Sequence, residues 1–165
     1  MRKLVIAAGT AMALFAVTTP SFSMGSGSTG GAGEYGGSAG ATGDYAIAIH
    51  LIKHEMYSQA IPHLLMAHVD KPNDADILNY LGYANRMIGH FDSSMIYYKQ
   101  ALAINPGHKG VHEYMGELYL QMHDLPSAQH ELDTLASLCP SGCDERDTLT
   151  KSIAAYVPPA GSTPN

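Results

Sequence analysis

The feature that most constrains the fold of this chain is an internal repeat of fixed period. Proline recurs at Pro72, Pro106 and Pro140, whose positions differ by 34. Small, aromatic and aliphatic residues keep the same phase at Ala60, Ser94 and Ala128; at Tyr57, Phe91 and Leu125; at Leu64, Tyr98 and Leu132; and at Ala67, Ala101 and Leu135. Such a period indicates a stack of similar units, because each unit buries its apolar face only against its neighbours.

Within one period the pattern predicts two helices. In the middle copy, apolar and small residues at helical spacing precede a turn at Gly89-His90, and a second helix starts at Phe91-Asp92 with Asp92 as its expected N-cap. Small residues at Gly82 and Ser94 would let the two helices approach closely. We expect the seam between them to be filled by Leu78, Leu81, Tyr98 and Leu102.

These positions resemble the tetratricopeptide repeat, with Leu78 in the position where the family has Trp. The middle copy reads Leu78-x2-Leu81-Gly82-x2-Asn85, then Ser94-x3-Tyr98, then Pro106. The third copy reads His112-x2-Met115-Gly116-x2-Tyr119, Ala128-x3-Leu132, Pro140, and the first, most degenerate copy reads Asp44-x2-Ile47-Ala48-x2-Leu51, Ala60-x3-Leu64, Pro72. The resemblance places the repeats at 41–74, 75–108 and 109–142.

The resemblance implies an all-α fold, a right-handed superhelix (solenoid) of three helix pairs. Residues 144–156 are similar to the capping helix that closes such arrays, so the folded domain is expected over 44–156. It also implies a concave face that binds peptides or proteins. Carrying over the inner-helix positions of the family places the following residues on that face: Tyr45, Ile49, Ile52, Lys53, Asn79, Tyr83, Arg86, Met87, Glu113, Glu117, Leu120 and Gln121.

The composition of this predicted groove changes along its length. Apolar residues gather in the first two copies, where Ile49, Ile52, Tyr83 and Met87 are expected to form a patch that repeat packing does not need, and carboxylates gather in the third. This mixture fits a peptide with apolar anchors and one basic group. The alternative is that these residues touch the linker or face solvent. The Lys and Asn arrangement by which chaperone-binding members hold a C-terminal carboxylate is not matched, because copy three has Gly110 and Tyr114 where a basic pair is needed.

The N-terminal residues predict export. Residues 1–23 combine a positive start, an apolar run over 4–17 and small residues at Ser21 and Ser23, which is the pattern of a cleavable signal peptide. Residues 24–43 are a Gly/Ser-rich linker expected to be disordered, and 157–165 are expected to be a disordered tail. We therefore expect a periplasmic or secreted protein, which touches the membrane only through its signal peptide before cleavage.

Charge excludes other classes of partner. The chain has 9 Lys and Arg against 15 Asp and Glu, a net charge of −6. Without Arg2 and Lys3, 7 basic residues oppose the same 15 acidic ones, which leaves −8. An acidic chain is a poor ligand for nucleic acid and for anionic membrane surfaces.

Cys139 and Cys143 are the two cysteines of the chain, and they flank the expected turn before the capping helix. We expect them to form a disulfide bond, since this spacing across a turn suits the bond. The competing interpretation is a redox dithiol, which the C-x3-C spacing disfavours against C-x-x-C.

Histidine raises a second alternative. His50 and His54, and likewise His108 and His112, stand at i and i+4, where one helical face could offer two nitrogens to a metal ion. His112, however, falls in the seam of its repeat, so a half-buried structural histidine is the simpler interpretation, and a mild pH response is expected rather than a metal site.

No catalytic motif occurs in the sequence, so we predict no enzyme activity, no cofactor and no metal. The predicted function is an exported module for protein–protein interaction, with an unidentified protein or peptide partner. Two alternatives stay open: a metal- or redox-linked envelope protein, and a structural subunit that assembles with itself.

Overall fold

The structure, a computed structural model, describes residues 41–159, and in that range the chain contains helices and loops without strands. The predicted signal peptide at 1–23 and residues 160–165 of the tail lie outside the described residues. The helices are α1 (Ala41–Lys53), α2 (Tyr57–Asp70), α3 (Ala75–Met87), α4 (Phe91–Ile104), α5 (Lys109–Gln121), α6 (Leu125–Leu138) and α7 (Asp144–Ala155). None of the described helices is long and apolar enough to cross a membrane.

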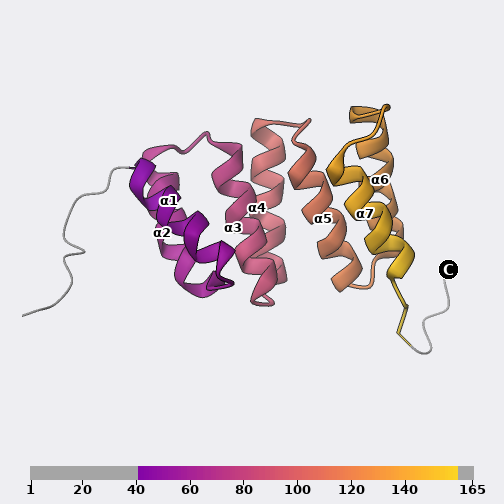
Figure 1. Cartoon of the computed structure of the whole chain (residues 1–165), viewed down its shortest axis with the longest axis horizontal. Helices are drawn as coiled ribbons and strands as arrows, with labels where there is room; N and C mark the ends of the chain where they lie inside the picture. Colours follow the sequence, from indigo (N-terminus) through magenta and orange to yellow (C-terminus); the bar gives the residue numbers. More distant parts are fainter. Residues whose placement is uncertain (1–40, 160–165) are drawn as a thin grey trace, which may run out of the picture. The chain divides into compact units, whose positions relative to one another are not determined.

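Helix boundaries recur with the period found in the sequence. The first helices of the three pairs begin at Ala41, Ala75 and Lys109, and each pair is followed by a short turn. Neighbouring helices lie side by side in chain order (Figure 1), and α3 also contacts α5 while α5 contacts α7. We call α1, α3, α5 and α7 the inner helices and α2, α4 and α6 the outer helices. This arrangement confirms the predicted all-α superhelix of helix pairs.

The start of α1 differs from the predicted linker boundary. The linker was expected to extend to Gly43, but α1 begins at Ala41. Gly43 costs the helix about 0.5–1 kcal/mol of backbone entropy relative to alanine, and the packing of α1 against α2 offsets this cost. Composition alone therefore extended the linker too far, into the first turn of α1.

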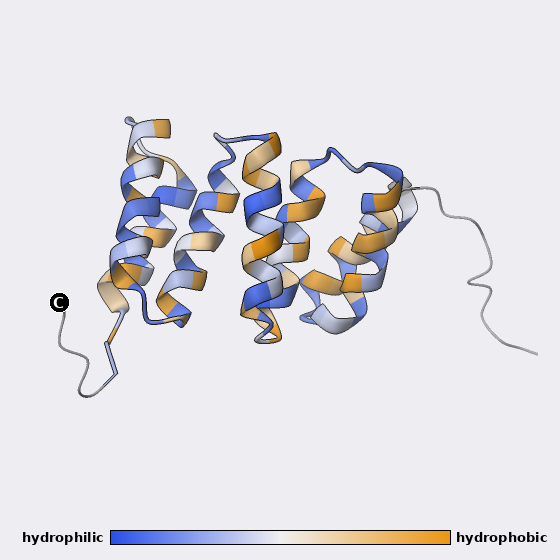
Figure 2. Ribbon diagram, turned by 180° about the vertical axis from the view of Figure 1, so that it is seen from behind, coloured by the Kyte–Doolittle hydropathy of each residue, from blue (hydrophilic) through white to orange (hydrophobic). Residues whose placement is uncertain are grey.

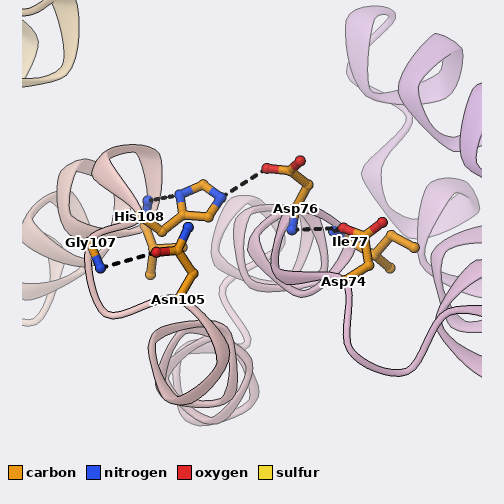
Figure 3. A network of polar contacts seen from close by, with 7 residues as sticks. Asp74, Asp76, Ile77, Asn105, Gly107 and His108 are labelled. Carbon is orange, nitrogen blue, oxygen red and sulfur yellow. Dashed lines mark hydrogen bonds and ion pairs between the residues drawn. The ribbon is translucent and has the colours of Figure 1, made fainter.

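Aspartate caps start two of the helices, though not the one expected from the sequence. The Asp74 carboxylate accepts hydrogen bonds from the backbone N–H groups of Asp76 and Ile77 at the start of α3 (Figure 3), and Asp124 accepts one from Ser127 at the start of α6. Asp92 lies inside α4, whose N-cap is His90 without a side-chain cap. The turn at Gly89, with φ of 81°, ends early enough for the helix to begin at Phe91.

The core of the array forms where the helices of each pair meet. Leu78, Leu81 and Tyr98 are fully buried between α3 and α4, and the Ser94 hydroxyl donates to the Gly82 carbonyl over 2.8 Å. Figure 2 shows hydrophobic and hydrophilic residues mixed along every helix, as expected for helices that each keep one side in solvent. The seam residues predicted from spacing are therefore in the core, with Leu102 partly buried beside them.

The last helix closes the third repeat. Leu149 of α7 is fully buried and lies against Gly116 of α5, where an added Cβ would come within 2.5 Å of Leu149 Cδ2. The structure joins Cys139 and Cys143 by a disulfide with an S–S distance of 2.02 Å and a Cα–Cα distance of 6.0 Å. The bond spans the turn between α6 and α7, so it ties the cap to the preceding outer helix.

Candidate functional site

The residues predicted for the binding face lie on the inner helices α1, α3 and α5, at positions that recur from one repeat to the next. Residues of neighbouring inner helices come close together, because α3 contacts α5 and the ring of Tyr45 on α1 contacts that of Tyr80 on α3. The structure brings Tyr83 and Arg86 of α3 together with Glu117 of α5. It leaves Lys53, Met87 and Gln121 exposed at the C-terminal ends of their helices.

Two groups of tyrosine rings, which we call together the tyrosine row, connect α1 to α3 and α3 to α5. Tyr45 meets Tyr80 edge-on with centroids 6.0 Å apart, and Tyr83 lies between Tyr57, at 5.7 Å, and Tyr114, at 4.9 Å. Burial raises the pKa of Tyr45 and of Tyr114 to about 12, so both hydroxyls stay protonated at neutral pH and can donate hydrogen bonds. The row therefore offers apolar ring faces with polar edges.

Three of these tyrosines were missed by the sequence analysis. Tyr80 and Tyr114 occupy the same position of successive repeats, and this recurrence was a signal that could have found them. Tyr57 opens α2, an outer helix, so no inner-helix rule points to it. Its contribution to the row depends on the way α2 packs beside α3.

Arg86 forms a buried ion pair within the array, so its charge is not available to a ligand. Its side chain is 5% exposed, and its Nη2 donates to Glu117 Oε2 over 2.7 Å. The guanidinium carbon also lies 5.4 Å from the Tyr83 ring centroid and 5.8 Å from that of Tyr114. A buried guanidinium requires such a partner, because an unpaired buried charge is costly. Arg86 thus joins α3 to α5 and holds both rings and Glu117 in place.

Glu113, one turn before Glu117 on α5, has the opposite character. It is half-buried, and no hydrogen bond or ion pair to it occurs among the described residues. Burial, followed by the nearby charges of Glu117 and Glu145, raises the pKa of Glu113 to about 7. Within the described part of the chain, Glu113 is therefore a carboxyl group without an ion pair, and the charge of Arg86 offsets only part of the rise in its pKa.

Several predicted contact residues are not available to a ligand. Asn79 and Arg86 are each 6% exposed and Leu120 is 9% exposed, so these side chains belong to the packing between helices. The expected free patch is also partly wrong. Ile52 packs against the core, and Tyr83 contacts two other rings, so of that patch Ile49 and Met87 remain less constrained. Helical phase identifies the inner helices, but it does not show how deeply neighbouring helices cover each position.

The histidine pairs do not form a metal centre in the described part of the chain. The rings of His50 and His54 have centroids 4.3 Å apart and planes tilted by 30°, and His54 Nδ1 donates to the His50 carbonyl over 2.8 Å. His112 is buried against Glu131. Among residues 41–159, no group of three or more His, Cys, Asp or Glu side chains is placed to hold a metal ion.

The family profile of the tetratricopeptide repeat matches residues 75–108, which span α3 and α4 and the loops that follow them. The second helix pair is a tetratricopeptide repeat. The match has the bounds that the period of the sequence predicts for the second repeat, and the first and third pairs carry helices of the same lengths at the same offsets.

Solved structures of tetratricopeptide-repeat proteins are similar to this array. The Yersinia enterocolitica type III secretion translocator chaperone SycD has a TM-score of 0.63 at 18% identity, over 73% of this chain and 90% of SycD. The first repeat domain of Spaghetti (RPAP3), bound to the HSP90 peptide SRMEEVD, has a TM-score of 0.60 at 16% identity, over 74% and 100%. SycD in complex with a peptide of the translocator YopD has a TM-score of 0.60 at 18% identity, over 68% and 86%. Likeness at such identities establishes the fold. No match was found among the sequences of curated proteins.

Proposed function

We propose that this protein is a non-enzymatic interaction module that binds a peptide or a protein segment along its inner helices. The observation that carries the proposal is the row of tyrosine rings on α1, α3 and α5, which ends beside the unpaired carboxylate of Glu113. Aromatic side chains with a polar edge are typical anchors of interfaces. Two of the similar folds carry peptides, the HSP90 peptide on Spaghetti and the YopD peptide on SycD, which supports a peptide as the ligand here.

The chemistry of the face favours a segment with apolar side chains and one basic side chain. The apolar part would lie along the exposed edges of the half-buried Tyr45, Ile49 and Tyr80 and along the exposed Met87. The basic group would lie at Glu113, where a Lys or Arg would neutralise a carboxylate that burial and its acidic neighbours disfavour. Arg86 does not serve this purpose, since its charge is already paired with Glu117.

Site-specific photo-crosslinking tests where the partner binds. A photoreactive phenylalanine derivative at Met87, which ends the inner helix α3 and is 40% exposed, should capture the partner. The matched control is the same group at Ile96, which is 55% exposed on the outer helix α4. Equal capture from both positions, or capture from Ile96 alone, would contradict binding along the inner helices.

The captured segment, made as a synthetic peptide, then tests the basic group. Glu113→Gln should weaken binding of that peptide by about 1–2 kcal/mol, because a charge-assisted hydrogen bond is lost. Asp92→Asn removes an exposed carboxylate from the outer helix α4 and should leave the dissociation constant unaltered. If the two variants bind alike, the partner does not use a basic side chain at Glu113.

We also propose that the protein acts outside the cytoplasm, in the periplasm or after secretion. Two features of the chain support this location. Residues 1–23 have the pattern of a cleavable signal peptide, and Cys139 and Cys143 form a disulfide, a bond that persists in oxidising compartments. Fractionation of the native host with N-terminal sequencing of the protein tests the location. A protein that retains Leu4 and co-purifies with cytoplasmic markers would refute it.

Self-association is a second candidate function, and one surface favours it. On the outer helix α2, Leu65, Met66 and Val69 are 40%, 55% and 72% exposed, and the three lie within one turn of each other. Neighbouring apolar side chains in solvent are typical of an interface. Sedimentation of the wild type and of Met66→Lys at several concentrations tests it: a dimer that Met66→Lys dissociates supports the idea, and a monomer at all concentrations ends it.

A further inference from the structure

The ring of His112 lies between two hydrogen-bond acceptors. His112 Nδ1 is 2.7 Å from Glu131 Oε2 on α6, and Nε2 is 2.9 Å from the carbonyl oxygen of Pro106 in the turn before α5. Both side chains of the ion pair are buried, with exposures of 8% for His112 and 7% for Glu131. The contact therefore links α5, α6 and the turn between α4 and α5 away from water.

The number of protons in this contact follows from the partners. A carbonyl oxygen only accepts, so Nε2 must carry a proton. The remaining 2.7 Å contact needs one further proton, either on Nδ1 as an imidazolium or on Glu131 as a carboxylic acid. In both cases the pair holds one proton more than a neutral histidine beside an ionised glutamate. Without that proton, two lone pairs face each other and a net negative charge is buried.

His108, one turn earlier, shows the contrast. Its Nδ1 accepts a hydrogen bond from the backbone N–H of Val111 over 3.2 Å, and its Nε2 is 2.9 Å from Asp76 Oδ1. Figure 3 shows this ring between α3 and α5. A neutral imidazole protonated on Nε2 satisfies both contacts.

The other two repeats hold different residues at the positions equivalent to His112 and Glu131. The equivalent positions in the first repeat hold Asp44 and His63, which form the same kind of pair at 2.8 Å with the roles exchanged. His63 is 37% exposed, so water can replace its partner there. In the second repeat the positions hold Leu78 and Tyr97, which form no such pair. A buried proton between inner and outer helix is thus a feature of the third pair among the described residues.

Few other titratable groups face this contact. Among residues 41–159, Glu131 of α6 is the one charged group in contact with the His112 ring, and the carbonyl of Pro106 contacts the ring from the turn. Beside Glu131 lies Tyr119 of α5, whose pKa is raised by burial and then by the charges of Glu131 and Asp124. His108, the N-cap residue of α5, precedes His112 by one turn, and Glu113 of α5 is the next residue after it.

We propose that His112 and Glu131 form a proton-dependent clasp, which holds α5 to α6 and to the turn after α4 and which releases when the shared proton leaves. The clasp lies beside the proposed binding face, because Glu113, Tyr114 and Glu117 follow His112 on the same helix. Loss of the proton would free the third repeat to move and would alter this end of the face.

The direction of the pH effect follows from linkage. The hydrogen bond to Glu131 comes first among the causes that raise the pKa of His112 above its ordinary 6.5. The unfolded chain therefore releases this proton at lower pH than the folded one. The stabilisation is complete below about pH 6.5 and is lost as pH rises through the higher folded value. Within that window, one proton makes the unfolding constant rise by up to about tenfold for each pH unit.

Glu131→Gln isolates the proton, because it removes the charge and keeps the shape. The glutamine amide donates to His112 Nδ1, and a neutral ring then satisfies both contacts. Urea unfolding between pH 5.5 and 9 should show the wild type more stable at the acid end and the two proteins converging as pH rises. The difference between their slopes should approach one proton. Titrations shared by both proteins cancel in this difference.

Two further variants complete the test. His108→Gln keeps both clasp residues and changes a histidine one turn away, so its pH curve should still differ in slope from that of Glu131→Gln. His112→Leu with Glu131→Tyr installs the residue pair of the second repeat and should also converge with the wild type at high pH. This double variant decides the matter if Glu131→Gln does not fold. Parallel pH curves for the wild type and for either clasp variant would overturn the proposal.

Discussion

Gly82 and the ring of Tyr98 are in direct contact between α3 and α4, so no side chain fits at residue 82. A Cβ on Gly82 would lie 2.3 Å from Cε1 and 2.4 Å from Cδ1 of Tyr98, which is fully buried. Ser94 fastens the same crossing, since its hydroxyl donates to the Gly82 carbonyl. Close packing of α3 against α4 therefore requires glycine at position 82.

Gly82→Ala should lower the free energy of unfolding by about 1–3 kcal/mol, because the buried ring must leave its position to accept the methyl group. Gly107→Ala is the matched control. Its Cβ would meet Leu138 at 3.6 Å, an ordinary contact, so the change should be within about 0.5 kcal/mol of neutral. Urea denaturation of both variants measures the difference. Equal effects would show that the Gly82–Tyr98 contact does not limit the packing.

Glu117→Gln should lower the free energy of unfolding by about 2–4 kcal/mol, because Arg86 would keep its buried charge without an ionised partner. Thermal and urea unfolding at pH 7 measure the loss. Substituting Arg86 by Met in the same background should recover part of it, since the uncompensated charge is then gone. If adding Arg86→Met lowers the free energy of unfolding by a further similar amount, the loss does not come from an uncompensated charge.

Glu113→Gln should act in the opposite direction at neutral pH, although the residue is one turn away on the same helix. The pKa of Glu113 is raised to about 7, so the folded state is favoured when this carboxyl is protonated. Its contribution is present below the ordinary value for glutamate and is lost as pH rises toward 7. Because the group is half-exposed, we expect Glu113→Gln to stabilise the protein by about 1 kcal/mol at pH 8 and to have little effect at pH 4. Urea unfolding of the wild type and of Glu113→Gln at pH 4 and pH 8 measures the sign of the change in stability.

Leu149→Ala should lower the free energy of unfolding by about 2–4 kcal/mol, because it empties the contact between α7 and Gly116. Hydrogen exchange should become faster in α7 and at the C-terminal half of α5. Lys151→Ala, at an exposed position of the same helix, serves as the control. Unchanged protection of α7 in Leu149→Ala would mean that the cap is held by other contacts.

Reduction of the bond between Cys139 and Cys143 should cost about 2 kcal/mol at most, because the disulfide closes only a short loop across one turn. Melting temperatures with and without reductant, and for Cys139→Ser with Cys143→Ser, measure this contribution. The double serine variant should be insensitive to reductant. Two free thiols in protein isolated from its native compartment, detected by alkylation and mass spectrometry, would rule out the bond there.

The fold was predictable from the sequence because its signals are local. Helical spacing, the turn at Gly89 and the prolines after each outer helix act within a few residues, so their regular recurrence placed the helix pairs. Helical spacing also predicted which side chains are buried between the two helices of a pair, as the burial of Leu78 and Leu81 illustrates. Even here, local rules misplaced one cap, since Asp92 lies inside α4.

The partners of individual side chains were decided by tertiary structure alone. Gly82 and Gly116 have the same phase, yet the first is covered by Tyr98 of its own pair and the second by Leu149 of the following inner helix. Arg86 was predicted for a groove and is instead buried against Glu117 of the next inner helix. Periodicity specifies which face of a helix a residue occupies, and it carries no information on how closely the next helix approaches that face. Contact between repeats, and with it the charge and protonation of the buried groups, follows from that approach.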